Sequence, residues 1–190
     1  RVWVSNADGN WEDTANWEGG VLPTAVDDAQ IATAGVTVTI NSAVDVSGID
    51  SDADIVVADG SLRLSADSIF DGAMTVAAGK GLTLAGAGVD IAANGAVAVD
   101  GANLAAVDGA VLALPGVTTF ASFDAFGGIT TFRAEGAGSR LELPNLETVV
   151  SAGASFSYLN VEANAGGFVD LGGLTTISTP SAGGGSRKGV

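Results

Sequence analysis

The 190-residue chain contains no cysteine and no histidine. Without cysteine it has neither disulfides nor thiolate chemistry. Without histidine it lacks the commonest metal ligand and the usual general base at neutral pH. Basic residues are also scarce, since seven Lys and Arg stand against 22 Asp and Glu, for a net charge of −15. This balance argues against nucleic acid and against anionic membrane surfaces as partners, because both depend on Lys and Arg for binding.

Long apolar runs are missing as well. No stretch of about 18 apolar residues is present, so the sequence predicts no transmembrane helix. The chain also lacks an initiator Met and a signal-like apolar segment, which we interpret as a mature form or a fragment. Hydrophobic residues nevertheless make up 47% of the chain, many of them Ala and Val, and there are 28 glycines. Small residues in this quantity favour narrow turns and tight stacking over a bulky globular core.

One nine-residue pattern occurs three times, at 112–120, 141–149 and 169–177, with offsets of 29 and 28 positions. Its first, third, sixth and ninth positions are apolar, and its fifth is Gly or Asn. Alternation predicts a short strand, and the central Pro-Gly, Pro-Asn or Gly-Gly predicts a tight turn before a second strand. A regular repeat of this length is typical of coils whose strands pair in parallel with those of the next coil. The sequence therefore predicts an all-β, single-stranded parallel β-helix.

A shorter phrase recurs outside these copies: a strand end, a small polar turn with Gly or Asn, and an alternating strand. Its final apolar residues are separated by 20, 15, 15, 29 and 28 positions, and they are Leu64, Leu84, Val99, Leu114, Leu143 and Leu171. Because the two separations of 15 together approach the later repeat, we predict later coils of roughly 28–30 residues with two or three sides. The earlier coils are expected to be less regular.

Segment 1–31 differs from the rest, because it contains all three tryptophans: Trp3, Trp11 and Trp17. The order Gly-Asn-Trp at 9–11, Asp13, Asn-Trp at 16–17 and Gly-Gly at 19–20 resembles the N-terminal module of large secreted bacterial β-solenoid proteins with autotransporter-type β-strand repeats. The resemblance covers about a sixth of the chain directly. It implies a right-handed β-helix exported to the cell surface or the medium, and it implies no activity.

The residues themselves favour the same interpretation of this segment. A stack of coils has two open ends with unpaired strand edges, so terminal units need atypical caps. We predict a cap at 1–31, β-helix coils at 32–180 and a flexible Gly/Ser-rich tail at 181–190. The alternative for Trp3, Trp11 and Trp17 is a platform on which sugars stack.

Other aromatic residues gather in the second half of the chain: Phe120, Phe123, Phe126, Phe132, Phe156, Tyr158 and Phe168. Phe120, Val149 and Ile177 share one repeat position, and Phe132 shares another with Val161. Equivalent positions stack in a repeat protein, so these columns are expected in the interior. Tyr158 remains the aromatic candidate for ligand binding in this half.

Carboxylates are the only plentiful reactive groups. Asp50, Asp52 and Asp54 alternate, so they would project to one face of an extended segment. Because Ca²⁺ takes carboxylate and carbonyl oxygens, these residues are a candidate calcium site. The alternative is a solvated acidic loop without a metal. No other cofactor is predicted.

Two further function classes fit the sequence poorly. A polysaccharide hydrolase needs a pair of carboxylates set a few ångströms apart, and Asp27 and Asp28, an adjacent pair of aspartates, lie in the cap segment. An ice-binding surface needs a flat file of Thr, but in pairs such as Thr118-Thr119 the neighbours point to opposite faces. Glu147 also interrupts the first position of that pair.

We therefore predict a non-catalytic structural or adhesive module of an exported bacterial protein, located outside the cell or on its surface. The alternative is a glycan-binding module that uses Trp3, Trp11, Trp17 or Tyr158. The expected partners are a polysaccharide or another cell-surface component. End-to-end contact through the C-terminal coil is a further candidate interaction.

Overall fold

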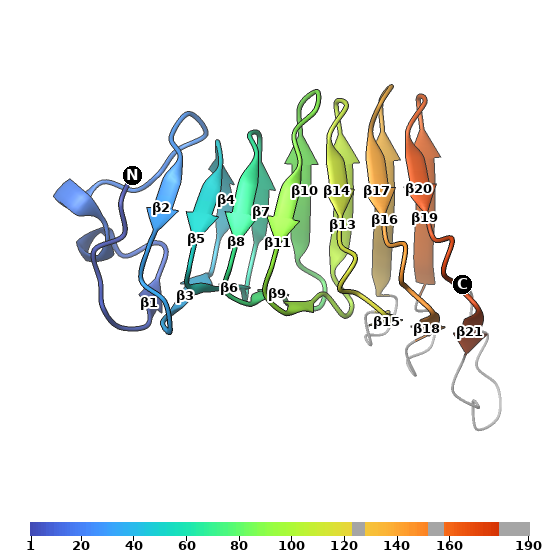
Figure 1. Ribbon diagram of the computed structural model, residues 1–190, viewed down its shortest axis with the longest axis horizontal. Helices are drawn as coiled ribbons and strands as arrows, with labels where there is room; N and C mark the ends of the chain where they lie inside the picture. Colours follow the sequence, from blue (N-terminus) through green and yellow to red (C-terminus); the bar gives the residue numbers. More distant parts are fainter. Residues whose placement is uncertain (123–127, 152–157, 179–190) are drawn as a thin grey trace.

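The computed structural model describes residues 1–122, 128–151 and 158–178, and short strands follow one another along a single long axis (Figure 1). Two 3₁₀ helices near the N-terminus, η1 (Thr14–Asn16) and η2 (Glu18–Gly20), are the only helical elements in these ranges. All other elements are β-strands, so the prediction of an all-β chain is confirmed.

The strands form five sheets. The longest, the six-stranded sheet, contains β4 (Ala43–Val46), β7 (Ser61–Leu64), β10 (Gly81–Ala85), β13 (Asn103–Val107), β16 (Ile129–Glu135) and β19 (Tyr158–Asn164). A five-stranded sheet contains β1 (Gly9–Asn10), β3 (Thr37–Ile40), β6 (Asp54–Val57), β9 (Met74–Val76) and β12 (Val97–Ala98). A four-stranded sheet contains β2 (Ala29–Ile31), β5 (Ile49–Ser51), β8 (Ser68–Phe70) and β11 (Ile91–Ala93).

Two three-stranded sheets complete the second half of the molecule. One contains β14 (Val111–Ala113), β17 (Arg140–Glu142) and β20 (Phe168–Asp170), and the other contains β15 (Thr119–Ala121), β18 (Thr148–Val150) and β21 (Thr176–Ser178). Every strand pairing within the five sheets is parallel.

From β4 onward, the chain visits these sheets in a fixed order. A strand of the six-stranded sheet is followed by one strand in each of two other sheets, and the chain then returns to the six-stranded sheet. We call one such passage a circuit. Strands pair with those of adjacent circuits, and at the junction between β10–β12 and β13–β15 only the six-stranded sheet continues, an arrangement compatible with the expected parallel β-helix.

The core is built from columns of like residues in register. In the six-stranded sheet, Leu62, Leu82 and Leu104 are paired in succession, and each is fully buried. The side chains between them point outward, as the period of two in a strand requires. Repetition at one position therefore fills the interior with apolar side chains from circuit to circuit.

The three copies of the nine-residue pattern stack as predicted. Their first positions lie on neighbouring strands, as do their last positions, Phe120, Val149 and Ile177. Phe132 pairs with Val161, again as predicted. Phe120 and Phe132 are buried and their rings meet edge to face with centroids 4.7 Å apart. Phe123, Phe126 and Phe156 lie outside the described residues.

The early circuits are less regular, as predicted, and the two separations of 15 positions do not add up to one circuit. Leu84 does not align with Leu114 by way of Val99; it pairs with Ala106, 22 positions on. The strand–turn–strand phrase occurs at every corner of a circuit, so counting phrases does not count circuits. Later circuits are longer, since Leu104 pairs with Phe132 over 28 positions and Phe132 with Val161 over 29, within the predicted range.

Most of the additional residues of the later circuits enter at one corner, and a few enter between β14 and β15. In an early circuit, β3 ends at Ile40 and β4 begins at Ala43. In a later circuit, β15 ends at Ala121 and β16 begins only at Ile129. The change in repeat length therefore mainly reflects a longer connection into the six-stranded sheet.

Segment 1–31 contains the aromatic cluster. Trp17 packs edge-on against both other indoles, with ring centroids 5.2 Å from Trp3 and 4.7 Å from Trp11. Its Nε1–H donates a hydrogen bond of 2.8 Å to the Trp11 carbonyl oxygen. The segment is continuous with the sheets, because β1 pairs with β3 and β2 pairs with β5.

Candidate functional site

The outer face of the six-stranded sheet carries polar side chains from successive circuits. Thr131 pairs with Asn160 on the next strand, and Arg133 pairs with Glu162. Asn103 lies on β13, directly beside Thr131 on β16. Since each strand shows alternate residues to solvent, the parallel register gathers these side chains on one surface.

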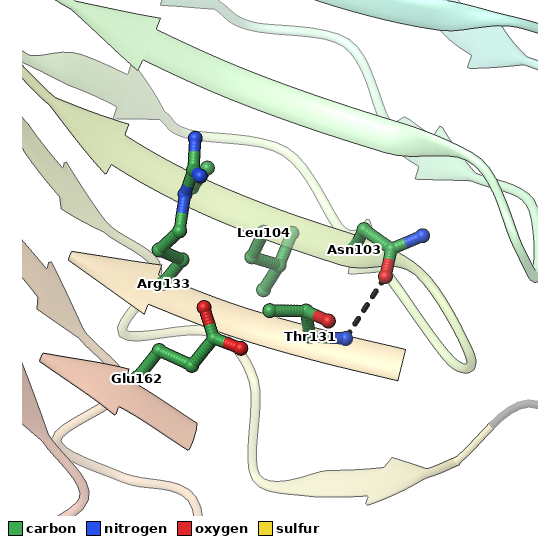
Figure 2. A pocket seen from close by; sticks show the side chains of 6 residues that line it. Asn103, Leu104, Thr131, Arg133 and Glu162 are labelled. Atoms are coloured by element: carbon green, nitrogen blue, oxygen red, sulfur yellow. Dashed lines mark hydrogen bonds between the residues drawn. The ribbon is translucent and has the colours of Figure 1, made fainter. Parts of the chain in front are cut away.

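A shallow groove of about 360 Å³ lies between these side chains (Figure 2), and its lining is Asn103, Leu104, Ala105, Thr131, Arg133 and Glu162. Ala105 is in register with Arg133. Its methyl group is much shorter than the side chains around it. The hollow follows from this difference in side-chain size.

Three of the lining residues have defined partners. The Oδ1 atom of Asn103 accepts a hydrogen bond of 2.9 Å from the backbone N–H of Thr131, as the dashed line in Figure 2 shows. Arg133 forms an ion pair with Glu135 on its own strand, with Nη1 and Oε2 3.1 Å apart. Asn103 and Arg133 are thus held in place by the fold.

Glu162 differs from its neighbours. It faces Arg133 across the strand pair, yet the guanidinium and the carboxylate point in different directions (Figure 2). Within the described residues, the side chain of Glu162 has neither a hydrogen bond nor an ion pair. Its carboxylate is available to accept hydrogen bonds from a ligand.

The groove therefore offers an amide, a hydroxyl, a guanidinium and a carboxylate on a flat and half-exposed surface. Such groups form hydrogen bonds with neutral polar ligands. Tyr158, predicted as a ligand-binding residue, is 40% exposed at the start of β19 and pairs with Ile129, without lining the groove.

The three predicted tryptophans occupy a different kind of place. Trp3, Trp11 and Trp17 are only 1–3% exposed and pack against one another. An indole buried to this extent has no free face on which a sugar ring could stack, so the burial speaks against the sugar-platform alternative for these residues. Their burial agrees with the interpretation as a cap.

The structure distributes the predicted calcium ligands over two sheets. Asp50 lies on β5, Asp54 lies on β6, and Asp52 lies at the corner between them. Asp54 already accepts a hydrogen bond of 2.7 Å from the backbone N–H of Ala73. In the part of the chain that the structure describes, no three Asp, Glu, His or Cys residues come together as a metal-binding group.

Asp50 instead borders a second hollow, of about 440 Å³, on the four-stranded sheet, together with Asp28 and Asp67. Asp67 is engaged there as the acceptor of a 3.1 Å hydrogen bond from the backbone N–H of Asp90. The calcium site at Asp50, Asp52 and Asp54 stays a prediction.

The threonine pairs behave partly as expected. Thr130 is buried while Thr131 faces outward, so neighbours do point to opposite faces. The second member of the repeated pair forms a short file, Thr119, Thr148 and Thr176, in register across β15, β18 and β21.

Sequence reasoning missed the groove, although a signal for it was present. Asn103 and Thr131 are 28 positions apart, and Arg133 and Glu162 are 29 apart. Both separations match the repeat length, so the repeat would have placed each pair on adjacent strands. The longer spacing begins at β13, before the first nine-residue copy, which is why the copies alone did not reveal it.

Comparisons with protein-family models, with curated proteins and with solved structures found no match to this chain. No helix within the described residues has the length and hydropathy needed to cross a membrane.

Proposed function

We propose that the chain is a single-stranded, right-handed parallel β-helix that serves as a non-catalytic structural or adhesive module of an exported bacterial protein. The observation that carries this proposal is the succession of parallel circuits with apolar columns in register, which begins at the tryptophan cluster. A stack of this kind behaves as a stiff rod, because the six-stranded sheet runs through the circuits from β4 to β19 and the shorter sheets support it on the other sides.

The surface supports the same function. A net charge of −15 keeps a strand-rich chain soluble and discourages association between exposed sheet faces. The resemblance of the Trp-containing opening segment to secreted β-solenoid proteins supports a location outside the cell. A polysaccharide or another cell-surface component is the partner class that we propose for the adhesive role.

Glycan binding is the second candidate function, and the groove on the six-stranded sheet favours it. Asn103, Thr131, Arg133 and Glu162 present the hydrogen-bonding groups that sugar hydroxyls require. Tyr158, 40% exposed on β19, adds an aromatic face on the same sheet. The buried tryptophans take no part in this version of the proposal.

Titration with polysaccharides separates the two functions. A passive module shows no heat of binding by calorimetry with a panel of bacterial and plant polysaccharides, and the panel releases no reducing sugar. A glycan-binding module gives saturable heat that Glu162→Gln and Arg133→Gln weaken about tenfold or more, whereas Arg63→Gln, on the outer face of β7, leaves it unchanged. Release of sugar would overturn both candidates in favour of an enzyme.

A further inference from the structure

The two ends of the molecule differ in how they are closed. In the described ranges, β19, β20 and β21 each have a pairing partner on one side only, and they form the C-terminal end in Figure 1. Val161 and Ile177 belong to interior columns, yet they are 49% and 54% exposed there. An unpaired strand edge beside exposed apolar side chains favours pairing with another chain.

The backbone of β19 shows which groups face that edge. The N–H of Tyr158 donates to the Gly128 carbonyl, and the Asn164 carbonyl accepts from the Gly136 N–H. Residues 158, 160, 162 and 164 therefore direct their backbone groups toward β16 and its adjoining turns. By alternation, Leu159, Val161 and Ala163 direct theirs toward the open edge.

The same alternation holds on the other two strands. The N–H of Phe168 donates to the Ser139 carbonyl, so its neighbour Val169 faces the open edge. The Ser178 carbonyl accepts from the Ser151 N–H, so Ile177 faces it as well. At the centre of each of the three strands, one apolar residue thus presents its N–H and C=O groups outward along the stack.

We propose that a second copy of this chain covers the C-terminal end, tail to tail, about a twofold axis through Val161 of β19. The tryptophan cluster covers the opposite end. In a head-to-tail arrangement, the exposed strand edges of one copy would therefore meet the covered end of the next. A twofold axis brings two open ends together and yields a closed dimer.

The register that this axis imposes is complementary on the six-stranded sheet. The two β19 strands become antiparallel with Val161 opposite its own counterpart and Leu159 opposite Ala163 of the second copy. These are the residues whose backbone groups face the edge, so they form hydrogen-bonded pairs. On the outer face, Glu162 comes opposite Asn160, which avoids a pair of like charges.

The same axis sets β20 of one copy against β21 of the other. Val169 then lies opposite Ile177, joining two interior columns. Asp170 lies opposite Thr176, again without like charges. The last circuit supplies roughly 20 residues from each copy, which is the size of a specific protein–protein interface.

This inference rests on the β-helix of the proposed function, but its test is separate, because it measures association and not polysaccharide binding. Sedimentation equilibrium of the full chain is expected to show a dimer at about 100 µM. Val161→Lys is expected to raise the dissociation constant of the dimer at least a hundredfold. Val26→Lys, at an 88% exposed position near the other end, should leave it unchanged. A wild-type monomer at this concentration, or an open-ended polymer, would overturn the proposal.

A cysteine variant tests the position of the axis even if the lysine variant folds poorly. The chain has no cysteine of its own, so Val161→Cys introduces a single thiol. The paired Cα atoms would be about 5.5 Å apart, within the range of a disulfide. Mild oxidation is expected to yield a cross-linked dimer from Val161→Cys and not from Val26→Cys. Dimers of Val161→Cys that stay uncross-linked would overturn the proposed register.

Discussion

The two ends of the stack solve the same physical problem differently. At the N-terminal end, three indoles fold over one another and stay 1–3% exposed. At the C-terminal end, residues from the same kind of interior column remain about half exposed. The comparison teaches that a regular repeat does not close itself: closure needs either residues that break the repeat, as the tryptophans do, or contact with another chain.

The largest effect is expected where the closed end depends on one side chain. Trp17 contacts both other indoles and donates to the Trp11 carbonyl. Trp17→Ala should lower the free energy of unfolding by about 3–5 kcal/mol, because it removes a large buried ring and leaves a cavity. Urea unfolding followed by circular dichroism measures this. The matched Val26→Ala should stay within about 0.5 kcal/mol, and equal losses in the two variants would contradict the capping role.

A second comparison runs along a single column. Phe120 is fully buried, whereas Ile177, two circuits further along the same column, is 54% exposed. Phe120→Ala should cost about 3–5 kcal/mol, while Ile177→Ala in dilute, monomeric protein should cost about 1 kcal/mol or less. Unfolding at low protein concentration checks the difference. If both truncations cost the same, the column does not end at an open face.

A third prediction concerns corners where backbones of adjacent circuits approach. A Cβ atom on Gly72 would lie 2.3 Å from the Ala53 carbonyl oxygen, whereas one on Gly116 would meet nothing within 4 Å. Gly72→Ala should therefore destabilise the chain by about 1–3 kcal/mol, since the circuits must move apart. Gly116→Ala is the matched control, with an expected change within about 0.5 kcal/mol. Thermal unfolding measures the stability of both variants. Equal changes would mean that loss of glycine flexibility, and not the close approach at Gly72, determines the effect.

The smallest effect is a dependence of the N-terminal end on pH. The side chain of Thr24, by hydrogen bonding, holds the pKa of the Asp27 carboxyl below its ordinary value of 3.8, and Arg1 acts in the same direction. A carboxylate whose folded-state pKa is lowered stabilises the fold above its unfolded pKa, and that contribution is lost as the pH falls through the folded value. Stability should thus decline below about pH 4, less steeply in Asp27→Asn. Urea midpoints measured against pH check this; parallel curves for the two proteins would contradict it.

The sequence predicted the regular part of the molecule best. Large apolar residues recur at Leu112 and Leu141, and at Phe120 and Val149, with unbroken spacing, so the stacking could be inferred directly. The early circuits were harder, because similar Gly-containing turns occur at each of their corners and no residue type distinguishes one corner from another. The repeat spacing could have placed the polar side chains of the groove on adjacent strands, but the hollow itself depends on the small side chain of Ala105, which gives no sequence signal.

The burial of the tryptophans could be inferred only as one of two alternatives. An aromatic residue beside Gly and Asn fits both a cap and a sugar platform. A cap requires that the rings contact one another, whereas a sugar platform requires that a ring face be exposed. Ring contact depends on the turn around η1, where the Asp13 side chain caps the helix by accepting a hydrogen bond from the Ala15 N–H. Such a turn brings Trp17 back onto Trp11, which spacing alone does not show.

The pairing of each strand only with the circuits on either side has a consequence for how the protein assembles. Partners in the sheets lie within about one circuit of each other along the chain, for example Leu82 and Leu104, so no contact awaits a distant segment. A circuit that has folded offers its strand edges as a template on which the next circuit can pair. Folding can therefore propagate along the stack as the chain is synthesised.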